Sequence, residues 1–161
     1  MSKSYPDHFL TAQRLSKRYP DPSVERPLVW QKDSHITLVD FNGERINVHN
    51  IKQFTYLPLI VGPDAPKNAS TLFEVIQSET ALYSSLESAV WVGSRRWDLY
   101  FFDGLKVQLP EKDVPKAMTR LVGLLNFTDY KQQKYVSIDL RLPNRTAIRT
   151  WADEVLDENS T

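Results

Sequence analysis

Hydrophobic and polar residues alternate over residues 96–109, which is the pattern of two consecutive half-buried strands. On the first strand Trp97, Leu99 and Phe101 fall on one face, because successive side chains of a strand point to opposite sides. The pair Asp103-Gly104 separates the two runs, and this pair predicts a two-residue hairpin turn. The alternation therefore predicts a β-hairpin over 96–109.

The same patterns predict further strands on both sides of this hairpin. Residues 35–40 have strand character, and Asn42-Gly43 is a turn signal that lets residues 44–48 return as a partner strand. In residues 50–61, Pro58 favours an edge strand or an irregular segment over a central strand. Short strands are also expected at Val90–Val92, at 135–140 and at 146–151.

Two helices follow from capping signals and apolar stripes. Residues 62–70 have the composition of a loop. Ser70 or Thr71 is expected to cap a helix, with Glu74 three residues after Thr71 as a capping-box partner. Asp113 is expected to cap a second helix, with Pro115 in its first turn and a stripe of apolar residues after it. Strands and helices together predict an α+β fold.

Composition and charge exclude several classes of protein. The 161 residues are 41% hydrophobic and 25% charged, which is typical of a soluble globular protein. The 20 basic and 20 acidic residues balance, so the chain lacks the overall basic footprint of a nucleic-acid-binding protein. The sequence contains no cysteine, which removes disulfides, thiolate catalysis and cysteine-ligated zinc. No apolar run reaches the length of a membrane helix and MSKSYPDHFL is no signal peptide, so the sequence alone predicts a cytoplasmic protein.

No residues have the spacing of a catalytic or metal site. His8, His35 and His49 all lie in the N-terminal third, and no pair has the spacing of a helical metal site. We expect Asp98 to point outward from its strand and Asp103 to be used in the turn, so neither is expected to act as a general acid or base. The sequence therefore predicts no enzyme, no cofactor, no metal and no small-molecule substrate.

Two arginines precede Trp97. A strand places Arg96 and Trp97 on opposite faces, so we expect Arg96 to lie over Tyr100 or over a cross-strand neighbour. Arg95 and Arg96 are not accompanied by a wider basic stripe, so nucleic acid is not an expected partner.

The strand at 146–151 offers a binding surface if it ends the sheet. The free N–H and C=O groups of an edge strand can accept a strand from a partner. Arg141 and Arg149 flank this segment and suit acidic side chains on the partner, at about 0.2–1 kcal/mol for each exposed pair.

Three segments of the chain have a specific combination of motifs: FTYLPLIVGPDAPKNAS (54–70), RRWDLYFFDGLKVQLPEKD (95–113) and VSIDLRLPNRTAIR (136–149). Together they closely resemble the C-terminal half of the bacterial FtsQ/DivIB family of cell division proteins, in particular its alphaproteobacterial members. The resemblance runs from about Lys17 to Arg149. It implies a C-terminal β domain, made mainly of antiparallel sheet with two or three helices, that follows a partial POTRA-like segment.

The resemblance also implies a function. Members of the family are non-catalytic inner-membrane proteins that join FtsB and FtsL on the periplasmic side, and they help control septal peptidoglycan synthesis. Their β domain takes a strand from FtsB on its last strand. By matching motif, Arg141 is the arginine of the family's Asp-Leu-Arg element, and Leu142 replaces an aromatic residue of some members. The partner-binding residues implied in this way are Arg141, Leu142, Asn144, Thr146, Ala147, Ile148, Arg149, Arg95 and Arg96.

The N-terminal part departs from the family pattern. Residues 17–46 resemble the end of a POTRA domain that lacks a strand between Pro20 and Val24. We therefore expect a partial POTRA-like segment at 1–49, an FtsQ-type β domain at 50–151 and an acidic flexible tail at 152–161. Family members are anchored by a membrane helix that this sequence does not contain, which indicates a fragment, a mis-called start or a truncated gene product. An alternative function is that of a POTRA-type chaperone or insertase module of outer-membrane protein assembly, which would bind unfolded strands by the same edge chemistry.

Overall fold

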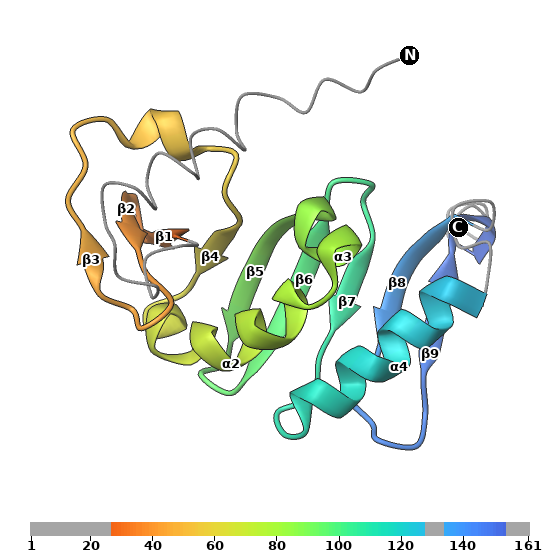
Figure 1. Cartoon of the computed structure of the whole chain (residues 1–161). Helices are drawn as coiled ribbons and strands as arrows, with labels where there is room; N and C mark the ends of the chain where they lie inside the picture. Colours follow the sequence, from red (N-terminus) through yellow and green to blue (C-terminus); the bar gives the residue numbers. More distant parts are fainter. Residues whose placement is uncertain (1–26, 128–133, 154–161) are drawn as a thin grey trace, which may run out of the picture. The chain divides into compact units, whose positions relative to one another are not determined.

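The computed structural model describes residues 27–127 and 134–153, and it contains the α+β arrangement that the sequence predicts (Figure 1). The chain forms two compact units that divide between Ser70 and Thr71. Each unit has its own set of paired strands. The expectations for residues 1–26 and for most of the acidic tail lie outside the described residues.

The strands of the first unit are hydrogen-bonded in the order β3-β2-β1-β4. β1 pairs antiparallel with β2 and parallel with β4. The strands predicted at 35–40 and 44–48 are present, whereas β1 was not predicted. The elements are β1 (Leu28–Lys32), β2 (His35–Val39), β3 (Arg45–Ile46), a short 3-10 helix η2 (Ile51–Phe54) and β4 (Leu59–Val61).

A small apolar core holds the first unit together. Val29, Leu38, Phe54 and Leu57 are buried against one another. The Asp40 carboxylate accepts hydrogen bonds from the backbone N–H groups of Asn42 and Glu44, both at 2.9 Å, and so closes the β2–β3 connection.

The strands of the second unit are hydrogen-bonded in the order β5-β6-β7-β8-β9. All neighbours are antiparallel except β7 and β8, which are parallel and are connected through helix α4. Helix α2 (Ala65–Gln77) contains the boundary between the two units. The other elements are α3 (Thr80–Ser85), β5 (Leu86–Val92), β6 (Arg96–Phe101), β7 (Lys106–Gln108), α4 (Val114–Phe127), β8 (Tyr135–Asp139) and β9 (Ala147–Thr150).

One apolar row crosses all five strands of the second unit. Directly paired residues share a face of a sheet, and the pairings join one residue from each strand. The row consists of Ala89, Leu99, Val107, Ile138 and Ile148. The first four are fully buried, whereas Ile148 on β9 is 37% exposed.

Helix α2 starts earlier than its sequence predicts. The helix begins at Ala65, inside the segment expected to be a loop, and Thr71 and Glu74 lie within it and do not cap it. Pro66 is compatible with this start, because proline in the first turn of a helix loses no intrahelical hydrogen bond. The capping-box prediction at Thr71 is therefore wrong.

The hairpin of β6 and β7 is confirmed, but its loop is longer than predicted. Phe101 N–H donates to Leu105 O at 3.0 Å, and Gly104 N–H donates to Phe101 O at 2.9 Å. The loop is therefore the three residues Phe102, Asp103 and Gly104, with Gly104 at a φ of 89°. The β2–β3 connection has the same bonds over Phe41-Asn42-Gly43, with Gly43 at a φ of 83°.

The positive φ of Gly104 gives a prediction for stability. A Cβ at position 104 meets no atom within 4 Å, so Gly104→Ala tests the backbone conformation alone. We expect Gly104→Ala to lower the free energy of unfolding by about 1 kcal/mol, because an L-residue is strained at this φ. Urea unfolding measures the change.

Gly123 provides the matched control. It lies inside α4 and its added Cβ also meets nothing within 4 Å. Gly123→Ala should raise the stability by about 0.5–1 kcal/mol, since alanine is the better helix former. Equal effects of the two substitutions would contradict the assignment of strain to Gly104.

Candidate strand-docking site

Strand β9 ends the sheet of the second unit, as the edge-strand prediction requires. It pairs with β8 on one side and comes last in the strand order. Every residue from Arg141 to Arg149 is exposed. The predicted turn at 142–145 is also present, closed by a bond from Arg145 N–H to Leu142 O.

The pairing with β8 determines which backbone groups of β9 face the open side. Trp151 N–H donates to Lys134 O at 3.0 Å, which places the groups of Trp151 toward β8. Backbone groups alternate along an antiparallel strand, so those of Ala147 and Arg149 also point to β8, whereas those of Ile148 and Thr150 point away. Thr150 N–H is bound by the Asp153 carboxylate at 2.8 Å. The N–H and C=O of Ile148 therefore form the centre of the open edge.

Exposed apolar side chains gather on the same segment. The described residues include five large hydrophobic side chains that are exposed, and three of them lie between positions 142 and 151. Leu142 is 58% exposed, Ile148 37% and Trp151 56%. An added strand beside β9 would extend the apolar row past Ile148 and cover this surface.

Arg141 is bound to a carboxylate of its own chain. Its Nε and Nη2 donate to Asp139 at 2.7–3.0 Å, and its backbone N–H donates to Asp139 Oδ1 at 3.0 Å. The hydrogen bond from Arg141 lowers the pKa of Asp139 below 3.8, although partial burial acts in the opposite direction. The same pairing raises the pKa of Arg141. Its charge is thus largely compensated before any partner binds.

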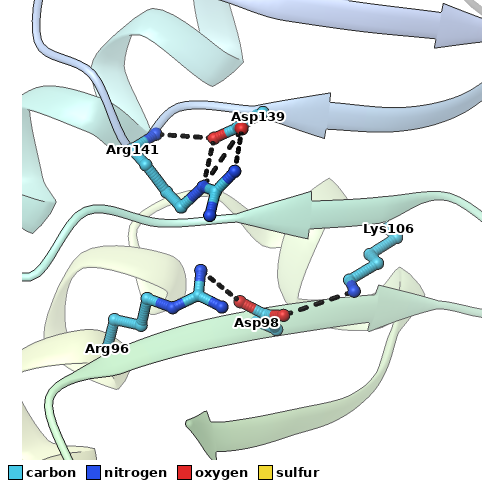
Figure 2. Close-up of polar contacts among 5 residues, drawn as sticks. All are labelled: Arg96, Asp98, Lys106, Asp139 and Arg141. Carbon is cyan, nitrogen blue, oxygen red and sulfur yellow. Dashed lines mark hydrogen bonds and ion pairs between the residues drawn. The ribbon is translucent and has the colours of Figure 1, made fainter. Parts of the chain in front are cut away.

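Arg96 lies on the same face of the sheet, in an ion-pair cluster around Asp98 (Figure 2). Arg96 Nη1 and Lys106 Nζ each lie 3.4 Å from a different oxygen of Asp98. The expectation that Asp98 is an outward-pointing surface residue is wrong, because it is 3% exposed. The cation over the Tyr100 ring is Lys106, at 5.5 Å, and not Arg96.

Figure 2 shows two sets of ion-paired residues, one around Asp98 and one formed by Asp139 and Arg141, and they interact electrostatically. Asp98 pairs with Gln108 and Gln108 with Asp139, so both carboxylates lie in one row across the sheet. The charge of Arg96 contributes to the lowered pKa of Asp139. Arg95 instead lies in the β5–β6 turn and is exposed. The structure therefore brings Arg96 near Arg141, while Asn144, Thr146, Ala147, Ile148 and Arg149 follow along the turn and β9.

Sequence reasoning missed three residues of this region. Asp139 is the internal partner of Arg141, and the i, i+2 spacing on one strand face was a signal for it. Asp98 is a buried carboxylate between two cations: Arg96 has the same i, i+2 spacing from it, whereas the contact with Lys106 depends on cross-strand pairing and has no local signal. Trp151 adds an exposed aromatic ring directly after β9.

The described residues do not gather three histidine, cysteine, aspartate or glutamate side chains into a group that could hold a metal ion. Over residues 27–127 and 134–153, no helix has both the length and the apolar character needed to cross a membrane.

Comparison with known proteins identifies the family. The profile of the C-terminal domain of cell division protein FtsQ/DivIB matches residues 28–141. The chain belongs to the FtsQ/DivIB family. The match begins at β1 and ends at Arg141, so it covers most of the described strands of both units.

Individual members of the FtsQ/DivIB family show the same relationship. Cell division protein FtsQ of Rhizobium meliloti (strain 1021) is 33% identical over 127 residues, 79% of this chain and 41% of the relative. FtsQ of Zymomonas mobilis is 33% identical over 137 residues, 81% and 43% of the two chains. FtsQ of Caulobacter vibrioides (strain NA1000 / CB15N) is 35% identical over 127 residues, 78% and 42%. The chain thus matches about two fifths of the length of these relatives, and the family assigns it to the proteins of bacterial cell division.

The buried cluster around Asp98 gives a second stability prediction. Asp98→Asn removes the counter-charge of Arg96, whose side chain is 16% exposed, and should lower the free energy of unfolding by about 2 kcal/mol. Asp139→Asn is the matched control. It removes the partner of the half-exposed Arg141 and should cost less than about 1 kcal/mol. Urea unfolding measures both changes. A larger loss of unfolding free energy in Asp139→Asn than in Asp98→Asn would contradict the assignment of the greater stabilisation to the buried Asp98 cluster.

The Asp139–Arg141 pair gives a prediction for pH. A carboxylate whose pKa is lower in the folded than in the unfolded chain stabilises the fold at pH values above its ordinary pKa of 3.8. This contribution is lost as the pH falls through the pKa of the folded state. We expect an NMR titration of the Asp139 carboxyl carbon to have its midpoint below 3.8. Arg141→Gln should move that midpoint upward. A wild-type midpoint at or above 3.8 would show that the pair does not form in solution.

Proposed function

We propose that this chain is a non-catalytic scaffold of the division machinery that binds an FtsB-like partner, in complex with an FtsL-like protein, through β9. The observation that carries the proposal is the open edge at Ile148, where no described strand pairs with the outer side of β9 and where the apolar row has its exposed end. Strand addition uses both features, because main-chain hydrogen bonds supply affinity and alternate side chains supply register.

The side chains of the edge suggest what the partner strand contains. Ile148 lies on the apolar face, so an apolar partner residue beside it would continue the row. Ala147 and Arg149 lie on the polar face, where acidic partner residues suit Arg149 and the exposed side of Arg141. Leu142 and Trp151 at the two ends of the segment would give apolar contacts beyond the strand itself.

Family membership supports the wider role. Within the division machinery, the proposed scaffold would act on the periplasmic side of the inner membrane and help control septal peptidoglycan synthesis. The POTRA-like identity of residues 1–49 and the division into domains at position 50 remain part of this proposal. No enzymatic step is assigned to the chain.

The experiment measures binding of the periplasmic C-terminal segment of the same organism's FtsB by titration calorimetry. Ile148→Pro removes the N–H that faces the open side, and an edge strand tolerates proline when this N–H is not in the ladder. We expect the Kd to rise about tenfold, because a partner carbonyl loses its main-chain hydrogen bond. Ile148→Val keeps the donor and most of the apolar surface and should bind nearly as tightly as the wild type.

Charge reversal at Arg141 would be a poorer test, since it places a carboxylate against Asp139 and disturbs the turn before β9. Equal affinities of Ile148→Pro and the wild type would exclude docking at this edge. Preferential binding of generic outer-membrane β-signal peptides would instead favour a chaperone or insertase module.

A further inference from the structure

The turn that precedes β9 is held by a side chain from helix α4. Arg120 Nη1 donates to Leu142 O at 3.0 Å, and Arg120 Nη2 donates to Arg145 O at 3.0 Å. Arg120 Nη2 also donates to the hydroxyl oxygen of Thr146. One guanidinium therefore binds the first residue of the turn and the two residues that lead into β9.

The turn depends on such an external contact. The residues of this segment are exposed, so burial does not hold them. The turn's own closing bond, from Arg145 N–H to Leu142 O, is 3.4 Å long, whereas protein N–H···O bonds are about 2.7–3.2 Å. A weakly closed, exposed turn would leave the start of the docking strand poorly fixed.

Arg120 is well placed to supply this contact. Its helix is anchored by buried side chains, since Ala117 and Leu121 are 3% and 0% exposed. Arginine carries its donors in a rigid planar fork, so a single side chain can bind two carbonyl groups with defined geometry. Arg120 thereby fixes Leu142 and the beginning of β9 relative to α4.

We infer that Arg120 is a positioning residue that pre-organises the docking edge without touching the partner. This inference rests on the proposed function of β9. Binding to a pre-organised strand avoids the loss of conformational entropy that ordering a loose one would require. The partner should therefore bind more tightly when Arg120 holds the turn, although the free energy of unfolding of the whole domain depends on it little.

Hydrogen exchange on the free chain tests the tether itself. In Arg120→Ala, the amides of Arg145 and Ala147 should exchange about tenfold faster, because the turn opens locally. Amides in the centre of the sheet, such as those of Leu99 and Val107, should keep their wild-type rates. Lys116→Ala is the matched control, since Lys116 lies one turn earlier on α4, lines the same surface recess as Arg120 and carries the same charge. It should leave all four amides unchanged.

Calorimetry with the same FtsB segment tests the consequence for docking. We expect the Kd of Arg120→Ala to rise about tenfold, that of Arg120→Lys to rise less because lysine can still donate to one carbonyl, and that of Lys116→Ala to stay unchanged. Unchanged exchange in Arg120→Ala, or faster exchange with an unchanged Kd, would overturn the inference. If the wild-type chain binds no peptide, the proposed function fails and the docking role of Arg120 fails with it, whereas the exchange rates still decide whether Arg120 tethers the turn.

Discussion

Burial of the apolar row from Ala89 to Ile148 is the constraint on which the second unit depends. Each of its five strands contributes one residue to the row, and the inner four are fully buried. Because side chains alternate with a period of two, a slip of one residue in any strand would move its member of the row to the polar face. The row therefore determines the register of the sheet and which face carries the charges.

The same constraint produces the open edge at β9. β9 must present Ile148 to the apolar face, yet among the residues that the structure describes no further strand follows it in the sheet order, so Ile148 keeps an exposed flank and an open edge. The polar face behaves differently. There Asp98 and Asp139 bind the nearby cations, so Arg96, Lys106 and Arg141 are already paired within the chain. A strand added to β9 would therefore interact through backbone hydrogen bonds and apolar contacts more than through positive charge.

Local patterns predicted several elements correctly because their signals are local. Alternation over 96–109 and the Asp-Gly pair identify a hairpin, and Asp113 with Pro115 marks the start of α4. Errors arose where two local signals compete. Pro66 belongs both to a loop-like composition and to the first turn of a helix, and Thr71 looks like a cap although it lies within α2. Likewise, Gly104 at a positive φ is compatible with a two-residue or a three-residue hairpin loop. The hydrogen bonds of Phe101 show that the loop has three residues.

The sequence by itself determined the α+β class, the hairpin, the last two strands and, through its motifs, the family. Those properties follow from periodicity, turn chemistry and residue identity, which a chain carries without its fold. Only the tertiary structure decided that Asp98 is buried between Arg96 and Lys106 and that Arg120 holds the turn before β9. The contact of Asp98 with Lys106 joins two neighbouring strands, and the contacts of Arg120 join a helix to a distant turn. Their partners are determined by sheet register and helix packing, which no local pattern encodes.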